Sequence, residues 1–342
     1  MNIPKVYIRC DAGGTYGLGH VVRCCNLARE FCSHNLEVVF ILQPNAPEGV
    51  TFVQENGFNC IVSHGIVGSE EDFVFLHNLV NAEAPYCLLI DSRDLTVGTS
   101  TRYRNLSCLI CIDDEKFRDL DCDFLINNNA FAKKTSYPIQ NNRTVLCGLE
   151  YNFLNKQLFS HEREKKDKTH VLLTTGGEDP GGFTAWLIKN IEPTLFEGYQ
   201  FDVIIGPSHP CPEIVFKASQ ESALKITHHI APNGLIPYIK RAHFAFTACG
   251  TTCYELIAAR IPMFAIAVED HQLAMADKLQ KQCLLTYLGG PSPLCAANVN
   301  SLISQIKNSP SELARIYENQ CAYIHGAGSE LVVKLIKDKI GQ

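Results

Sequence analysis

Short runs of almost purely apolar residues recur along this chain, and each is followed by a polar or glycine-containing turn and then by a stretch of helical length. The segments that carry these runs are KVYIRC (5–10), EVVFIL (37–42), YCLLID (86–91), SCLICIDD (107–114), VLLTTGGEDPGG (171–182), FDVIIGP (201–207), HFAFTACGTTCYELIAA (243–259) and PMFAIAV (262–268). Strands that are apolar on both faces are typical of parallel sheets covered by helices on both sides. The sequence therefore predicts an α/β protein whose ligands bind at the C-terminal ends of the strands.

The repeating pattern is interrupted once, where charged residues replace apolar ones at 156–168. We interpret this segment as a linker between two Rossmann-like domains, 1–155 and 169–327, because 342 residues are sufficient for two hydrophobic cores. Two such domains joined by a hinge are expected to face a cleft. The final segment, 328–342, carries a helical pattern that is expected to pack back on the junction.

Composition excludes several classes of partner. The net charge of −6 comes from interspersed acids and bases, so the chain lacks the basic face that nucleic acids require. No stretch approaches the roughly 20 apolar residues that span a bilayer, and the start of the chain lacks an apolar signal core. We therefore expect a cytoplasmic protein without a membrane span.

The sixteen cysteines lie within apolar strands and helices, and we expect them to be buried, reduced thiols. Cys108 and Cys111 have the spacing of zinc ligands, but no second pair accompanies them and they point to opposite faces of one strand. The sequence predicts no metal site and no cofactor.

A histidine stands at the start of the first predicted helix. Residues from Val21 onward follow helical spacing, so His20 falls in the first turn and Arg23 lies on a neighbouring face. The positive end of the helix and the guanidinium both disfavour an imidazolium, and we expect a neutral His20 that can accept a proton. A residue that only starts the helix is the alternative interpretation.

The turn before this histidine is not a dinucleotide-binding fingerprint. Gly17 and Gly19 form a Gly-x-Gly, but Val22 takes the place of the third glycine. Gln43, rather than an acid, follows the next strand, and no Gly-Lys-Ser/Thr phosphate loop occurs.

Three polar turns follow strands of the second half. They contain Gly176 and Gly177; Gly250, Thr251, Thr252 and Glu255; and Glu269, Asp270, His271 and Gln272. Backbone N–H groups at such glycine turns can approach a diphosphate, and Glu255 can accept both hydroxyls of a ribose. Ordinary turns, capping threonines and a solvent-facing glutamate are the alternatives, and the third turn is either a helix cap or a sugar contact.

The pair Asp113 and Asp114 raises the question of glycosidase chemistry. Adjacent residues of a strand point in opposite directions, so these two carboxylates cannot readily flank one bond. We expect them to end a strand and shape its loop, and Asn127, Asn128 and Asn129 to serve either in the cleft or in a turn.

Six segments of the chain occur in the same order as in a known protein family. They are GLGHVVRCCNLA, LLIDSRD, IDDEKFRDLDCDFLINNNAFA, LCGLEYNFL, TTGGEDPGG and ACGTTCYELIAARIPMFAIAVEDHQ. Over roughly residues 5–285 the chain resembles the UDP-sugar hydrolase family of pseudaminic acid biosynthesis. That family is related to the B-type glycosyltransferases, including the N-acetylglucosaminyl transferase of peptidoglycan synthesis. The resemblance implies a GT-B fold and a role in surface polysaccharide synthesis.

The resemblance also implies roles for particular residues. UDP would bind mainly to the second domain, with Glu255 on the ribose, the Ile230 loop near the uracil, and the turns at Gly176–Gly177 and Gly250–Thr252 around the diphosphate. His20 would take a proton from water as it attacks the anomeric carbon, with inversion. The implied partner is a UDP-sugar, and association with other glycan-biosynthesis enzymes is an expectation of the same resemblance.

Two departures from the family leave the sugar and the acceptor open. Where the family has a tyrosine, this chain has Ser92 and Arg93 after Asp91, and His271 replaces an asparagine before Gln272. We place Gly17, Gly19, Arg23, Asp91, Arg93, His271 and Gln272 among the substrate-binding residues. A glycosyltransferase and a non-catalytic nucleotide-sugar binding module are the alternatives to the hydrolase.

Overall fold

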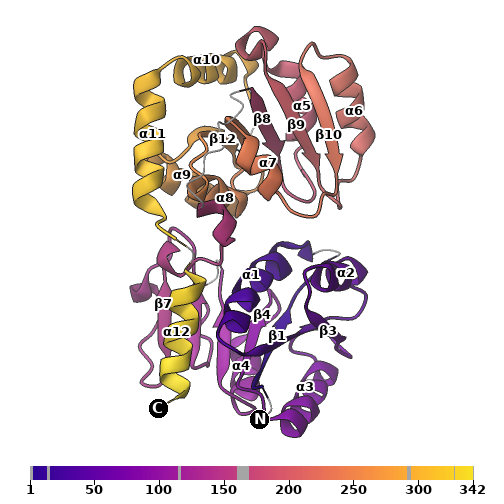
Figure 1. Cartoon of the computed structure of the whole chain (residues 1–342), viewed down its shortest axis with the longest axis vertical. Helices are drawn as coiled ribbons and strands as arrows, with labels where there is room; N and C mark the ends of the chain where they lie inside the picture. Colours follow the sequence, from indigo (N-terminus) through magenta and orange to yellow (C-terminus); the bar gives the residue numbers. More distant parts are fainter. Residues whose placement is uncertain are drawn as a thin grey trace. The chain divides into compact units, whose positions relative to one another are not determined.

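The computed structural model describes residues 3–13, 16–114, 117–159, 169–290, 294–326 and 328–341. The chain divides into two compact units, which we describe one at a time (Figure 1). Unit 1 contains Met1–Leu154 and Ala327–Gln342, and unit 2 contains Asn155–Gly326. Of the predicted linker, Lys156–Phe159 form a short 3-10 helix in unit 2, and residues 160–168 lie outside the described part.

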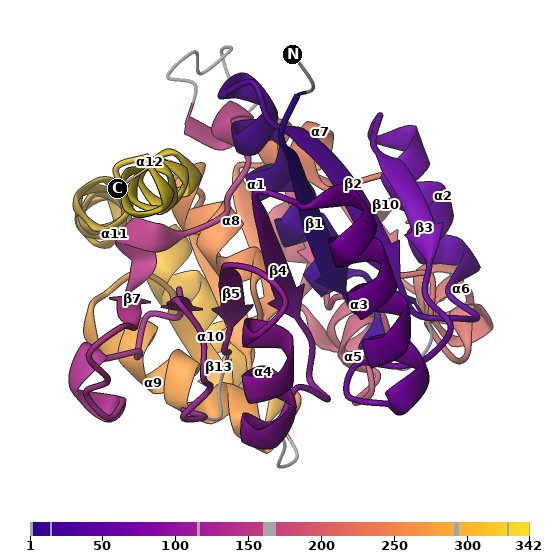
Figure 2. The ribbon, with the colours of Figure 1, turned by 90° about the horizontal axis from the view of Figure 1, so that it is seen from below.

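Unit 1 is built on a seven-stranded parallel sheet with the order β3-β2-β1-β4-β5-β6-β7, most of which can be followed in Figure 2. The strands are β1 (Lys5–Cys10), β2 (Glu37–Leu42), β3 (Asn59–Val62), β4 (Cys87–Asp91), β5 (Leu109–Ile112), β6 (Phe124–Asn127) and β7 (Thr144–Cys147). Strand order reverses between β1 and β4, the arrangement in which ligands bind at the carboxyl ends.

Helices cover both faces of this sheet because its strands are apolar on both sides. On one face lie α1 (Gly19–Ser33), α2 (Pro47–Glu55) and the C-terminal helix α12 (Ser329–Ile340), which packs against α1. On the other face lie α3 (Glu70–Glu83) and α4 (Val97–Arg104). Side chains alternate between the two cores, with Val6 and Ile8 in the first and Tyr7 in the second.

Unit 2 contains a six-stranded parallel sheet with the order β10-β9-β8-β11-β12-β13. Its strands are β8 (His170–Thr174), β9 (Gln200–Ile205), β10 (Lys225–Ile230), β11 (Phe244–Ala248), β12 (Met263–Ile266) and β13 (Thr286–Gly289). Its helices are α5 (Phe183–Asn190), α6 (Pro212–Gln220), α7 (Ile236–Arg241), α8 (Thr252–Ala258), α9 (Leu273–Lys281), α10 (Ala296–Lys307) and α11 (Pro310–Tyr323). Stacked phenylalanines, including Phe201, Phe246 and Phe264, fill the core of this unit.

The prediction of an α/β fold with parallel sheets is confirmed, and each predicted apolar run contains a strand. All sixteen cysteines are unpaired, and Cys108 and Cys111 pack into different cores of unit 1. The expectation that the thiols are buried is wrong for Cys32, Cys211 and Cys295, which are exposed. Among the described residues, no helix has the length and apolar character needed to cross a bilayer.

Candidate functional site

The carboxyl edge of the unit 1 sheet gathers most of the polar residues that the sequence singles out there. Helix α1 begins at Gly19, and Gly17 before it has a φ of 65°, in the left-handed region that favours glycine. A Cβ atom at Gly17 or Gly19 would meet nothing within 4 Å, so this turn leaves open space beside the first residues of α1. His20 and Arg23 lie in the first turn of that helix.

His20 is held by Asp91, the last residue of β4. The Nδ1 atom of His20 lies 2.8 Å from Oδ1 of Asp91, and both side chains are almost completely buried. A carboxylate can only accept a hydrogen bond, so the contact with Asp91 favours a proton on Nδ1, although Nη2 of Arg23 also lies 3.0 Å from that atom. In the neutral imidazole this tautomer leaves the lone pair on Nε2. No hydrogen bond in the described part of the chain uses Nε2, which leaves this atom able to accept a proton.

Arg23 joins two carboxylates. Its Nε lies 2.6 Å from Oδ2 of Asp91, and its Nη1 and Nη2 atoms lie 2.5 Å and 2.8 Å from the two carboxylate oxygens of Asp114. Burial alone would raise the pKa of Asp91, but Arg23 and His20 outweigh it and hold that pKa well below its usual range. Asp91 is therefore a carboxylate at any physiological pH.

These contacts change the role predicted for Asp91. The sequence places it among substrate-binding residues, whereas in the structure both of its carboxylate oxygens are occupied by His20 and Arg23. Neutrality of His20 stays a prediction.

His20, Asp91 and Asp114 offer ligand atoms that lie within 4.8 Å of one another, close enough to hold a metal ion. The guanidinium of Arg23 already donates hydrogen bonds to both carboxylates. A cation in this cluster would have to displace it or lie against it, so the residues present favour an arginine-neutralised site over a metal centre.

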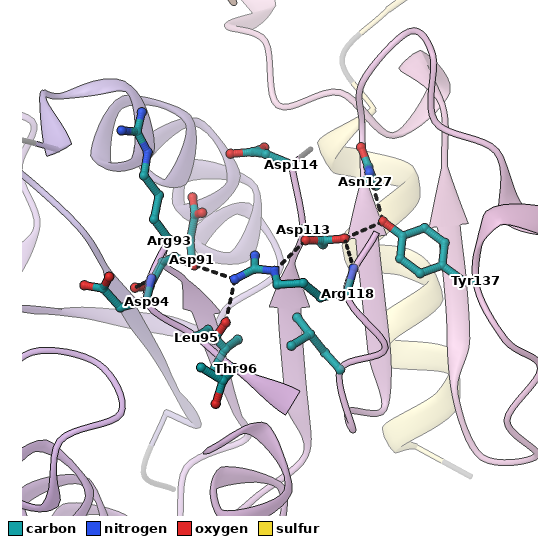
Figure 3. A network of polar contacts seen from close by, with 12 residues as sticks. Asp91, Arg93, Asp94, Leu95, Thr96, Asp113, Asp114, Arg118, Asn127 and Tyr137 are labelled. Carbon is teal, nitrogen blue, oxygen red and sulfur yellow. Dashed lines mark hydrogen bonds and ion pairs between the residues drawn. The ribbon is translucent and has the colours of Figure 1, made fainter. Parts of the chain in front are cut away.

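A second network shapes the same edge, and Figure 3 shows how its side chains converge. Asp113 accepts hydrogen bonds from Nε of Arg118 at 2.7 Å and from the hydroxyl of Tyr137 at 2.7 Å, while Asn127 donates to that hydroxyl at 2.9 Å. Arg118 also donates to the carbonyl oxygen of Leu95 at 2.6 Å. The network ties the loops after β4, β5 and β6 together, which gives Asp113 and Asn127 structural roles. Asp113 and Asp114 have different partners, as the sequence predicted from their alternation.

Arg93 and Asp11 complete this edge. The N–H of Arg93 donates to Oδ2 of Asp11 at 2.9 Å, and the N–H of Asp11 donates to the carbonyl oxygen of Asp91 at 3.0 Å. Burial is the main cause that raises the pKa of Asp11. Sequence analysis missed Asp11, although an acid directly after β1 was a visible signal.

In unit 2, the turn after β8 contains Gly176, with a φ of 90°, and Gly177. A Cβ atom at Gly206 would lie 2.4 Å from the carbonyl oxygens of both glycines, so only a glycine at 206 allows the turn to pack against the end of β9. Because those carbonyls face Gly206, the N–H groups of Gly177 and Glu178 face away from it, and no hydrogen bond in the described part uses them. This is the geometry of an anion-binding turn. Sequence analysis missed Gly206.

The turn after β11 lies beside the first, because β8 and β11 are neighbours. Helix α8 begins at Thr252, and β11 ends at Ala248 rather than at the predicted Thr247. Gly250 and Thr251 lie in the turn, and no hydrogen bond of the described part uses the N–H of Thr251 or Thr252. Glu255 stands in the first turn of α8, half-buried, and burial raises its pKa to about 7.

The remaining predicted residues fall in different places. Ile230 is the last residue of the edge strand β10 rather than part of a loop, and it is 64% exposed. The Oε1 atom of Gln272 accepts a hydrogen bond from the N–H of Val268 at 2.9 Å and closes the turn after β12, so a ligand contact at this residue is left to its Nε2. His271 belongs to a short 3-10 helix, Asp270–Gln272, and its side chain lies outside the described part.

Comparison with known proteins gives distant relatives. No protein-family model matches the chain. It is 22% identical to an uncharacterised protein of Methanocaldococcus jannaschii over 83% of its length and 58% of the relative's. It is 24% identical to the UDP-2,4-diacetamido-2,4,6-trideoxy-beta-L-altropyranose hydrolase of Campylobacter jejuni over 51% of its length and 61% of the hydrolase. The chain thus spans about three fifths of these two relatives.

The third relative matches from end to end. It is the spore coat polysaccharide biosynthesis protein SpsG of Bacillus subtilis, 22% identical over 97% of this chain and 98% of SpsG. Among solved structures, MurG of Acinetobacter baumannii matches with a TM-score of 0.65 at 13% identity, covering 98% of this chain and all of MurG. The calicheamicin glycosyltransferase CalG4 matches with a TM-score of 0.60 at 12% identity over both whole chains. The chain has the GT-B fold of these glycosyltransferases and resembles the altropyranose hydrolase and SpsG in sequence.

Proposed function

We propose that this protein is an enzyme that hydrolyses a UDP-linked amino or deoxy sugar to the free sugar and UDP, in nonulosonic acid or another surface glycan pathway. The observation that carries the proposal is the pair formed by His20 and Asp91. The carboxylate fixes the imidazole with Nδ1 protonated, so that Nε2 is presented as a general base.

In the proposed reaction a water molecule donates a proton to Nε2 of His20 while its oxygen forms a bond to the anomeric carbon. The bond between that carbon and the diphosphate oxygen breaks, and its electron pair leaves with UDP. Attack opposite the leaving group inverts the configuration. Asp91 stabilises the imidazolium that forms, and Arg23 holds Asp91 in place.

Unit 2 supplies groups suited to the leaving group. The unused N–H groups of Gly177, Glu178, Thr251 and Thr252 can donate to phosphate oxygens, so charge can be stabilised without a metal ion. Glu255 can accept hydrogen bonds from the two ribose hydroxyls, and the exposed Ile230 offers an apolar surface for the uracil.

The names of the relatives support the choice of substrate. The Campylobacter relative is named as a hydrolase of a UDP-linked trideoxy sugar, and the Bacillus relative is named for polysaccharide biosynthesis. We therefore propose UDP-sugars as substrates, a cytoplasmic site of action and association with other enzymes of glycan biosynthesis.

A glycosyltransferase is the second candidate, because the fold is shared with transferases and an acceptor hydroxyl can replace water at Nε2. Purified protein would be incubated with UDP-2,4-diacetamido-2,4,6-trideoxy-β-L-altropyranose and with UDP-N-acetylglucosamine, and UDP release would be followed with and without an added glycan acceptor. Release without acceptor supports the hydrolase. Release only with acceptor contradicts it in favour of the transferase, and UDP binding without turnover of any donor favours the binding module.

A further inference from the structure

The carboxyl edge of the unit 1 sheet is rich in acids that are already engaged. Arg23 binds Asp91 and Asp114, Arg118 binds Asp113, the hydroxyl of Tyr16 donates to Asp94, and the N–H of Arg93 donates to Asp11. These five carboxylates outnumber the three arginines of the same edge. An anionic ligand group would be repelled here unless a cation were free to receive it.

Arg93 is that cation. Its side chain is exposed, and in the described part of the chain it makes no hydrogen bond or ion pair, whereas Arg23 and Arg118 are both bound by carboxylates. Figure 3 shows the Arg93 side chain extending to the side on which the carboxylates of Asp91 and Asp114 lie, and away from Asp94. A guanidinium that lies among acids and contacts none of them is available to a ligand.

The backbone of Arg93 is fixed although its guanidinium is free. Asp11 accepts its N–H at 2.9 Å, and the hydroxyl of Ser92 accepts the N–H of Asp94 at 3.0 Å. Arg93 follows Asp91 by two residues, and Asp91 orients His20. The backbone of Arg93 is therefore fixed two residues from Asp91, the partner of the proposed general base.

We propose that Arg93 binds a carboxylate on the sugar, so that, among the UDP-linked sugars of the proposed function, those that carry an acidic group are preferred. This inference rests on the proposed function. The planar fork of a guanidinium matches the two oxygens of a carboxylate, and hydroxyl or amide substituents cannot use both donors equally well. The surrounding acids make the effect of Arg93 larger, because its removal leaves an acidic sugar facing carboxylates alone.

Calorimetric titration with UDP, UDP-glucose and UDP-glucuronic acid tests the inference, because the last two differ only by a carboxylate in place of a hydroxymethyl group. Wild-type protein is expected to bind UDP-glucuronic acid at least tenfold more tightly than UDP-glucose. Arg93→Gln should weaken binding of UDP-glucuronic acid about 10- to 100-fold and leave the affinities for UDP and UDP-glucose unchanged. The matched control is Arg315→Gln, an exposed arginine on α11 of unit 2, which should change none of the three affinities.

Equal wild-type affinities for the two sugars, or equal losses of both in Arg93→Gln, overturn the role of Arg93 while leaving the proposed function intact if UDP still binds. Failure of the wild-type protein to bind UDP contradicts the proposed function itself, and the inference falls with it.

Discussion

Two of the aspartate–arginine clusters in unit 1 have nearly the same chemistry, but one is closed and the other is open. In the closed cluster Nε of Arg9 lies 2.8 Å from Oδ1 of Asp72, and both side chains have no exposed surface. Ser63 and Tyr103 donate to the same carboxylate at 2.5 Å and 2.8 Å. In the open cluster around Asp91, Asp114 is one third exposed at its side chain, and His20 retains an unused nitrogen.

The difference shows how a buried ion pair can serve either the fold or a ligand. Arg9 and Asp72 join β1 to α3, and their other donors and acceptors are satisfied by the backbone and by Tyr103, so nothing is left for a ligand. Around Asp91, the same kind of pair fixes a histidine and leaves Nε2 available. We therefore expect substitutions at Asp91 to act on turnover and substitutions at Asp72 to act on stability.

The largest effect on turnover is expected from His20→Ala. Loss of the general base should lower kcat by about 100- to 10,000-fold, while the affinity for UDP stays within about twofold. UDP release and calorimetric titration measure the two quantities. His34→Ala, at the other end of α1, is the matched control and should leave kcat unchanged. Wild-type turnover by the His20→Ala protein would contradict a catalytic role for the open cluster.

Asp91→Asn should lower kcat by about 100-fold or more, because the amide no longer stabilises an imidazolium and can orient His20 through the wrong atom. As a positioning residue, Asp91 should also affect the pH dependence of kcat, so the pH profile of the variant should be displaced from that of the wild type. Asp114→Asn removes a carboxylate that touches Arg23 but not His20, and its loss of kcat should stay below about tenfold. Equal losses in the two variants would show that the charge of the cluster matters and not the contact with His20.

Asp72→Asn tests the closed cluster. Breaking this pair leaves the Arg9 charge buried and should lower the free energy of unfolding by about 3–5 kcal/mol, with kcat of the folded fraction unchanged. Chemical denaturation and UDP release measure the two. If Asp72→Asn does not fold, Ser63→Ala serves as the milder test. It removes a single hydrogen bond to Asp72 and should lower the free energy of unfolding by about 1 kcal/mol. Glu70→Gln, in an exposed pair with Arg102, is the control and should leave the denaturation midpoint unchanged. A loss of kcat in Asp72→Asn at full folding would break the distinction between the clusters.

Sequence patterns predicted the interior strands well and the edge strands poorly. Strands such as β1 and β4 are buried on both faces and consist mainly of apolar residues, whereas the edge strand β10 contains four polar residues of six and has no buried residue. Of the other strands outside the predicted runs, β3, β7 and β13 also lie at sheet edges, and β6 lies inside its sheet. All four have four residues, as do β5 and β12, which were predicted because they lie within longer apolar runs.

Within the site, helical spacing placed His20 and Arg23 together because they lie on one helix. The contact of His20 with Asp91 joins residues 71 positions apart, and it depends on the first turn of α1 lying at the end of β4, the neighbour of β1. Arg9 and Asp72 are 63 positions apart, and no local pattern pairs them. Local periodicity therefore located single residues, and only the strand order revealed which of them act together.

Glu255 differs from the aspartates of both clusters because its carboxyl group has no cationic partner in the described part of the chain. In the described part of the chain its side chain makes no hydrogen bond or ion pair, and burial raises its pKa to about 7, opposite to the lowered pKa of Asp91. Only the carboxylate form accepts hydrogen bonds from both ribose hydroxyls. Affinity for UDP-N-acetylglucosamine, whose phosphates do not titrate in this range, should therefore rise about tenfold between pH 6 and pH 8.

The matched variant Glu255→Gln separates this titration from all others, because an amide has no charge to gain. Its affinity should be lower than that of the wild type at pH 8 and should not change between pH 6 and pH 8.

The effect of pH on stability is opposite to its effect on binding: rising pH strengthens ligand binding and weakens the fold. Since the pKa of Glu255 in the folded state is raised above its ordinary value of 4.5, ionisation of this group destabilises the fold progressively as pH rises from about 4.5 to about 7. Glu255→Gln should therefore lose less stability than the wild type over that interval, and a wild-type affinity that stays flat with pH would mean that Glu255 does not contact the ribose.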